Sequence, residues 1–250
     1  MIPIEPTEGM FVAVTRTKRL HLGCGHNAPQ GWVNLDGSWN ARLSKYPGLR
    51  KLLKVLHVVP ASLLDIIWDP NILIHDVRKP LPFEDDTLSA IYASHLLEHL
   101  YLEEAKRLLK ECLRVLEPGG VLRMVVPDLR AIVSEYWEEK QSVASATRTE
   151  TVTAADKLNM KLLLHPPMPP SGNALYRLYT TWKDFHSHKW MYDAESLVRY
   201  FQWAGYIDVQ EMAFHHSRIP GIETIEEAGR VLNGAGICVE GIKPHWTRRS

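Results

Sequence analysis

Two glycines and an aspartate stand at positions that suit binding of a nucleoside-containing ligand. Gly23 and Gly25 follow one apolar, strand-like run, and Asp36 ends the next. Glycine lets the backbone approach a ligand closely, and a carboxylate at a strand end accepts hydrogen bonds from the hydroxyls of a ribose. The segment GCGHNA (23–28) also matches the G-x-G-x-x-[GA] fingerprint of dinucleotide sites, which is a weak signal by itself.

The spacing of these residues argues against a dinucleotide. In NAD sites the acidic residue follows about 20 residues after the glycine motif. Asp36 follows Gly23 by only 13 positions. That link leaves little room for a helix whose N-terminus would hold a pyrophosphate. A cofactor without phosphates, such as S-adenosylmethionine (SAM), does not need that helix end.

Polar residues also follow the other apolar runs of the first half of the chain. They are Asp76 after 72–75, Ser94 and His95 after 88–93, and Asp128 after 121–126. In open α/β sheets, ligands bind outside the carboxyl ends of the strands. Each residue alone also fits a structural role, such as a tight turn, a cap, or an ion pair between Asp76 and Arg78. Their succession at strand ends favours a binding site.

The elements that position these residues alternate between strands and helices. Strands are expected at 18–22, 32–35, 72–75, 88–93, 121–126, 206–214 and 236–242. Leucines at three- and four-residue spacing predict a helix over 102–116, stopped by Pro118-Gly119-Gly120, and Asp193 caps a helix that ends at Gly205. This alternation predicts an α/β fold with a mostly parallel sheet and helices on both faces. Helical insertions are expected at about 38–68 and 138–190.

The composition narrows the class of protein. Lys+Arg and Asp+Glu both number 29 in 250 residues, which disfavours a general nucleic-acid binder. Three dispersed cysteines indicate a reducing compartment, and no signal peptide or stable membrane insertion is predicted, so a cytoplasmic enzyme is expected. The basic segment 42–54 is interpreted as a solvated helix face over a core stripe, with a membrane-surface helix as the alternative.

Four segments resemble class I SAM-dependent methyltransferases, in particular the type-11-like group and a bacterial family of predicted SAM-dependent methyltransferases. They are RLHLGCG (19–25), WVNLD (32–36), HDVRKPLPFEDDTLSAIYASHLLEHL (75–100) and RVLEPGGVLRMVVPDL (114–129). The resemblance covers about residues 18–137, and 188–206 also resembles the bacterial family. It implies a single Rossmann-like methyltransferase domain with an antiparallel last strand and SAM as cofactor.

The resemblance also implies roles for individual residues. Gly23, Cys24 and Gly25 would line the methionine moiety, and Asp36 would hold the ribose hydroxyls. Asp76 and the backbone of Val77 would read the adenine edge, and Ser94 and His95 would face the methionine moiety and the substrate. One departure is the link from Gly23 to Gly31, which is shorter than a complete crossover.

Catalysis of methyl transfer needs a base only when the acceptor atom carries a proton. His95 is the first candidate for this base, followed by Asp128 and His186. The acceptor is expected to be a small molecule or a sugar-linked compound, bound between the strand ends and the aromatic-rich 138–192 region, where Trp182, His186 or Trp190 would face it. A SAM-binding protein without catalysis remains an alternative.

A second motif in the same region is typical of zinc hydrolases. His95-Leu96-Leu97-Glu98-His99 has the pattern H-x-x-E-H, which requires a long helix and a third ligand downstream. Because the motif directly follows an expected strand, we expect His95 at a strand end and no bound metal.

Overall fold

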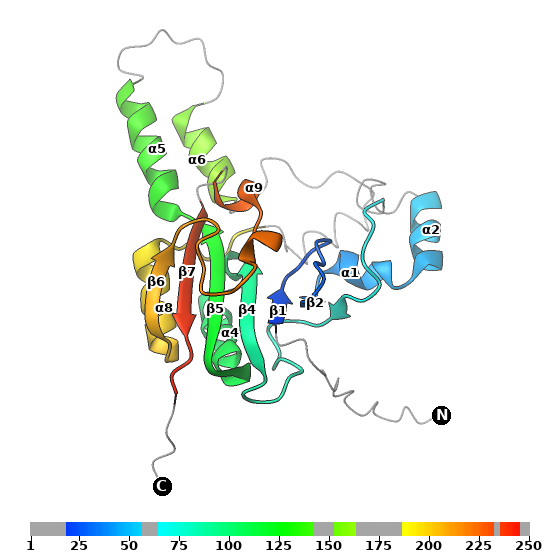
Figure 1. The fold of residues 1–250 in the computed structure, drawn as a ribbon. Coiled ribbons are helices and arrows are strands. Elements are labelled where there is room, and N and C mark those ends of the chain that lie inside the picture. The colour runs from blue at the N-terminus through cyan, green and yellow to red at the C-terminus, as the bar shows by residue number, and fades with distance from the viewer. Residues whose placement is uncertain (1–18, 57–64, 143–152, 164–186, 233–235, 246–250) are drawn as a thin grey trace.

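A seven-stranded sheet forms the centre of the computed structural model, which describes residues 19–56, 65–142, 153–163, 187–232 and 236–245 (Figure 1). The spatial order of the strands is β3-β2-β1-β4-β5-β7-β6. The strands are β1 (Arg19–Leu22), β2 (Val33–Asp36), β3 (Leu73–Ile74), β4 (Leu88–Ser94), β5 (Leu116–Pro127), β6 (Ile207–Met212) and β7 (Gly236–Ile242). Strands β1 to β5 pair in parallel, and β7 runs antiparallel to both β5 and β6. The predicted mostly parallel sheet with an antiparallel last strand is confirmed.

Helices and short helical turns surround this sheet. They are α1 (Trp39–Ser44), α2 (Pro47–Val55), η1 (Leu97–His99), α4 (Leu102–Val115), α5 (Leu129–Ser142), α6 (Ala154–Leu162), α8 (Ala194–Ala204), η2 (Ile222–Thr224) and α9 (Ala228–Val231). Side chains alternate along β4, so Ile91 and Ala93 pack in one core with α4 and α8, whereas Ala90 and Tyr92 pack in a second core with η2 and α9. Both faces of the sheet are covered, as predicted.

The helix α8 has the ends that the sequence indicates. Asp193 is its N-cap, and the carboxylate of Asp193 accepts a hydrogen bond from the Ser196 N–H at 2.8 Å. Gly205 ends the helix with a φ of 110°, a left-handed conformation that glycine adopts without strain.

The end of α4 differs from the prediction. The helix ends at Val115, and Leu116 already pairs with Leu88 of β4, so Pro118-Gly119-Gly120 lies inside the extended segment and not at the helix end. The pairing shifts register between Leu88 and Ala90. A Cβ at Gly120 would lie 2.8 Å from the Glu117 carbonyl oxygen, so the glycine permits this tight irregularity.

The interpretation of the basic segment is also corrected. Within the insertion, α1 buries Ala41 and Leu43, but α2 buries none of its side chains. The exposed apolar side chains of α2 and its end are Leu49, Leu52, Val55 and Leu56. The polar side of α2 contacts its own chain instead, through a hydrogen bond from Arg50 to the Ile66 carbonyl at 2.9 Å. The apolar side of α2 therefore does not cover a core stripe.

An ion cluster lies inside the second core. Arg123 of β5 is fully buried and donates hydrogen bonds to Glu226 and Glu240, both also fully or almost fully buried, at 2.9 Å. The cluster joins β5 and β7 to the segment that ends in α9. Among the described residues, no helix has both the length and the apolar character needed to cross a bilayer.

Candidate active site

The turn after β1 is built on two left-handed glycines. Gly23 has a φ of 63° and Gly25 a φ of 60°, a conformation in which an L side chain is strained. A Cβ on Gly23 would lie 3.1 Å from Leu96 in the loop after β4, whereas a Cβ on Gly25 would meet no atom within 4 Å. The turn thus lies at the boundary of β1 and β4, where the strand order of the sheet reverses.

Asp36 connects this turn to the end of β2. Its Oδ2 accepts a hydrogen bond from the Gly25 N–H at 2.9 Å, and its Oδ1 accepts one from the Ser38 N–H at 2.7 Å. The side chain is 6% exposed. The carboxylate therefore fixes the two loops to each other, which the sequence spacing alone did not predict.

The ends of β2 and β3 also abut at this edge. A Cβ at Gly37 would lie 2.3 Å from the His75 carbonyl oxygen, so the backbones can approach this closely only with glycine. Asp76 follows directly, and its two oxygens accept hydrogen bonds from Arg78 at 2.8 and 2.7 Å. The Arg78 guanidinium lowers the pKa of the Asp76 carboxyl to about 2. Asp76 thus makes the ion pair that the sequence offered as its structural role.

His95 occupies the first position after β4, as predicted. Its backbone is left-handed, with a φ of 52°, and its N–H donates to the Val125 carbonyl at 2.9 Å. The ring lies between two acceptors, because Nε2 is 3.0 Å from the Arg230 carbonyl oxygen and Nδ1 is 3.2 Å from Oε1 of Glu98.

This environment favours the protonated form of His95. Burial alone would lower the pKa of the imidazole, but the Glu98 carboxylate and the Arg230 carbonyl outweigh that effect, and the net shift is upward. To act as a base, His95 must first give up one of these two contacts, because only then is a ring nitrogen lone pair free.

Residues 20–124 match a family model described as a methyltransferase domain. Residues 20–124 therefore carry the sequence pattern of a methyltransferase domain. The matched residues include the turn after β1, Asp36, Asp76 and the loop after β4.

Solved structures of methyltransferases are similar to this chain at low sequence identity. A SAM-dependent methyltransferase from Archaeoglobus fulgidus is 14% identical, with a TM-score of 0.44, over 91% of this chain and 88% of the other. A complex of the Haloferax volcanii Trm112 activator and a methyltransferase is 16% identical, with a TM-score of 0.43, over 91% of this chain and 82% of the other. Haemonchus contortus phosphoethanolamine N-methyltransferase 2 bound to SAM is 13% identical, with a TM-score of 0.44. The similarity covers 94% of this chain and 50% of the other. A comparison with curated protein sequences finds no match.

The remaining predicted site residues lie in different surroundings. Ser94 ends β4, and its buried Oγ has no hydrogen-bond partner among the described residues. Asp128 lies after β5 and accepts a hydrogen bond from the Arg130 N–H at 2.9 Å, so it caps the start of α5. His186 and Trp182 lie outside the described residues. Trp190 is 42% exposed.

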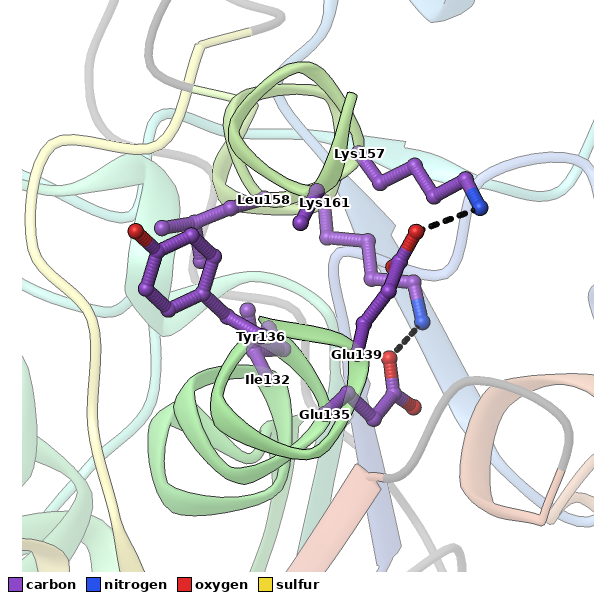
Figure 2. Close-up of a pocket in the computed structure, with 8 residues that line it drawn as sticks. Ile132, Glu135, Tyr136, Glu139, Lys157, Leu158 and Lys161 are labelled. Atoms are coloured by element: carbon purple, nitrogen blue, oxygen red, sulfur yellow. Dashed lines mark hydrogen bonds and ion pairs between the residues drawn. The ribbon is translucent and has the colours of Figure 1, made fainter. Parts of the chain in front are cut away.

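A pocket between α5 and α6 lies close to the same edge of the sheet (Figure 2), since α5 begins two residues after β5 ends. Two ion pairs cross it, Lys157 with Glu139 at 2.7 Å and Lys161 with Glu135. The charged residues of this pocket pair across it, from α6 to α5. We therefore interpret the pocket as part of the packing between these two helices.

Sequence reasoning did not predict that three buried polar residues lie together under the loop after β4. Glu98 is fully buried, His188 is 6% exposed and Tyr192 is 1% exposed. The H-x-x-E-H pattern was the signal for Glu98, but no local pattern places His188 or Tyr192 beside it.

Proposed function

We propose that this methyltransferase binds SAM across the carboxyl ends of β1, β2 and β4 and transfers the methyl group to a small-molecule or sugar-linked acceptor. The observation that carries the proposal is the hydrogen bond between the Gly25 N–H and Asp36, which sets the left-handed turn beside a strand-end carboxylate. Glycine backbone and carboxylate are the groups that a nucleoside with an amino-acid tail requires.

The residues present fit SAM. A carboxylate has about four lone-pair sites, and the backbone of Gly25 and Ser38 uses two at Asp36. The others remain for the two ribose hydroxyls. The space beside Gly25 and the unpartnered Oγ of Ser94 offer room and a polar contact for the methionine moiety.

The protein's part in the reaction is orientation. SAM supplies a methyl group that its sulfonium already activates, so the chain must hold the acceptor atom in line with the methyl carbon and the sulfur. Such positioning contributes up to about 7–11 kcal/mol in well-aligned systems. His95 would orient the acceptor by donating a hydrogen bond, or accept its proton after release of the Arg230 carbonyl.

The acceptor would bind where the loop after β4 meets the segment 187–192. Trp190 is partly exposed there, and an indole suits stacking on a sugar ring. The free, buried thiols of Cys24, Cys112 and Cys238 agree with function in a reducing compartment such as the cytoplasm.

Calorimetric titration with SAM and NAD tests the proposal. SAM should bind and NAD should not. Asp36→Ala should weaken SAM binding by about 10- to 100-fold, because loss of a charged hydrogen-bonding partner costs about 1.5–3 kcal/mol. Asp156→Ala is the matched control, since Asp156 also accepts a backbone N–H, that of Thr153, but caps α6.

Asp36 also supports two loops, so affinities must be measured well below each variant's unfolding temperature. SAM binding unchanged in folded Asp36→Ala would contradict the assignment of this residue. With binding established, labelled SAM and a panel of cell extracts and sugar nucleotides would identify the acceptor.

A further inference from the structure

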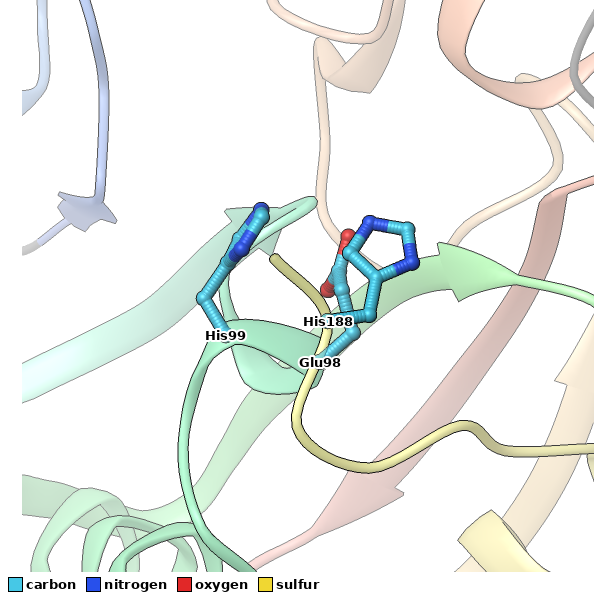
Figure 3. A group of neighbouring side chains, drawn as sticks. All are labelled: Glu98, His99 and His188. Atoms are coloured by element: carbon cyan, nitrogen blue, oxygen red, sulfur yellow. The ribbon is translucent and has the colours of Figure 1, made fainter. Parts of the chain in front are cut away.

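Three side chains that can ligate a metal converge beneath the proposed acceptor site. They are Glu98 and His99 of η1 and His188 (Figure 3). One ligand atom of each lies within 4.8 Å of those of the other two, and the two imidazole rings are 5.0 Å apart. Residues almost ninety positions apart in the chain thus meet at one point.

Backbone hydrogen bonds hold His188 in this place. The N–H groups of Lys189 and Trp190 both donate to the Glu98 carbonyl oxygen, at 2.7 and 3.3 Å. The His99 ring contacts the Ser187 carbonyl oxygen at 3.3 Å through Nδ1. The segment is therefore fixed to η1 on both sides of His188, and the cluster does not depend on side-chain contacts alone.

Burial leaves some polar atoms of this cluster with few partners. Glu98 is fully buried, and its Oε2 has no hydrogen bond among the described residues. Its Oε1 lies 3.2 Å from Nδ1 of the His95 ring. Nδ1 of buried His188 also has no partner. A buried carboxylate with one oxygen left without a partner is costly, and a bound cation lowers that cost.

We propose that Glu98, His99 and His188 bind one divalent transition-metal ion, with zinc as the best fit. Two imidazoles and one carboxylate are a ligand set of catalytic zinc sites, which keep a fourth position open. Tetrahedral zinc places such ligand atoms about 3.3 Å apart, so small side-chain rotations close the cluster around the ion. His95 lies beside Glu98 and would orient the ligating carboxylate.

The H-x-x-E-H pattern of zinc hydrolases requires a long helix and a third ligand downstream, and the fold supplies only the third ligand. Glu98 and His99 lie in a single 3-10 turn with His95 outside it, so the long helix of a zinc hydrolase is absent from this motif. The third ligand, however, comes from His188, which the fold brings across from a distant segment.

This site would act on the acceptor of the proposed methyl transfer, and that part rests on the proposed function. A hydroxyl bound at the open position becomes more acidic, as metal-bound water does. Its proton leaves to solvent, the oxygen bonds to the methyl carbon, and the carbon–sulfur bond breaks with its electrons on sulfur. An acceptor oxygen is therefore the class that the site favours.

Metal titration of the full chain, without a polyhistidine tag and after treatment with a chelator, tests the inference. Calorimetry and elemental analysis with zinc chloride should give one ion per chain, and cobalt(II) should give visible absorption bands. Glu98→Gln, His99→Ala and His188→Ala should each weaken binding at least 10-fold. His216→Ala, a change at an exposed histidine, should leave it unchanged.

The outcomes separate the two proposals, because neither metal titration nor SAM titration requires the other ligand. Absence of binding by zinc and cobalt, or equal binding in folded Glu98→Gln and His188→Ala, overturns the metal site even where SAM binds. Binding of one metal ion per chain, abolished by these substitutions, supports the metal site even where SAM does not bind.

Discussion

Acidification should destabilise this protein through one buried histidine. His21 of β1 is 4% exposed and lies against the ring of Tyr92, with centroids 5.4 Å apart. Its Nδ1 has no hydrogen-bond partner among the described residues. Burial lowers the pKa of the His21 imidazole from 6.5 to about 4, a shift that Asn34 opposes and Arg230 assists.

The shift fixes the sign and size of the effect. Between pH 6.5 and 4 the unfolded chain binds a proton at His21 that the folded chain does not, so stability rises with pH across this window. Each unit of pKa difference is worth 1.36 kcal/mol. Across the whole window His21 therefore lowers the free energy of unfolding by about 3.4 kcal/mol. About 2 kcal/mol of this is lost between pH 7 and pH 5.

Urea unfolding at pH 7.0, 6.0 and 5.0 measures this loss. His21→Phe keeps a ring against Tyr92 but cannot titrate, so its free energy of unfolding should fall by about 2 kcal/mol less than that of the parent over this range. His216→Ala, at an exposed position, should follow the parent. Equal pH dependence of the parent and His21→Phe would refute the reasoning.

Two further substitutions test the packing that positions the site. Arg123→Met should destabilise the fold by about 3–5 kcal/mol in thermal or urea unfolding, because it leaves two buried carboxylates without their cation. A variant as stable as the parent would show that the cluster contributes nothing. Gly37→Ala should lower stability by about 1–3 kcal/mol and weaken SAM binding, since its Cβ would clash with the His75 carbonyl oxygen. Gly48→Ala, which has open space in α2, serves as the control, and equal stability of both variants would contradict the close approach.

Local patterns determined most of the elements and the strand-end residues. Hydrophobic periodicity predicted α4, and Asp193 and Gly205 predicted both ends of α8. Apolar runs predicted every strand of the sheet, but β5 begins at Leu116, five residues before its predicted start. These features depend on interactions within a few residues, such as capping and helical spacing. The parallel sheet then follows from the alternation of strands and helices, so the edge that carries Gly23, Asp36 and His95 was predictable.

Contacts between distant segments decided the rest. The apolar run of β5 gave no reason for Arg123, which is stable there only because Glu226 and Glu240 arrive from other segments. The amphipathic pattern of α2 predicted burial of its apolar side, yet the pattern does not state whether another element covers that side.

The metal-ligand cluster shows the same division between sequence and fold. The sequence contains the H-x-x-E-H motif but does not specify the backbone hydrogen bonds that hold His188 beside Glu98. Spacing encodes which residues share a helix turn or a strand end. Only tertiary packing determines which buried charges meet, because that depends on segments that the chain brings together from far apart.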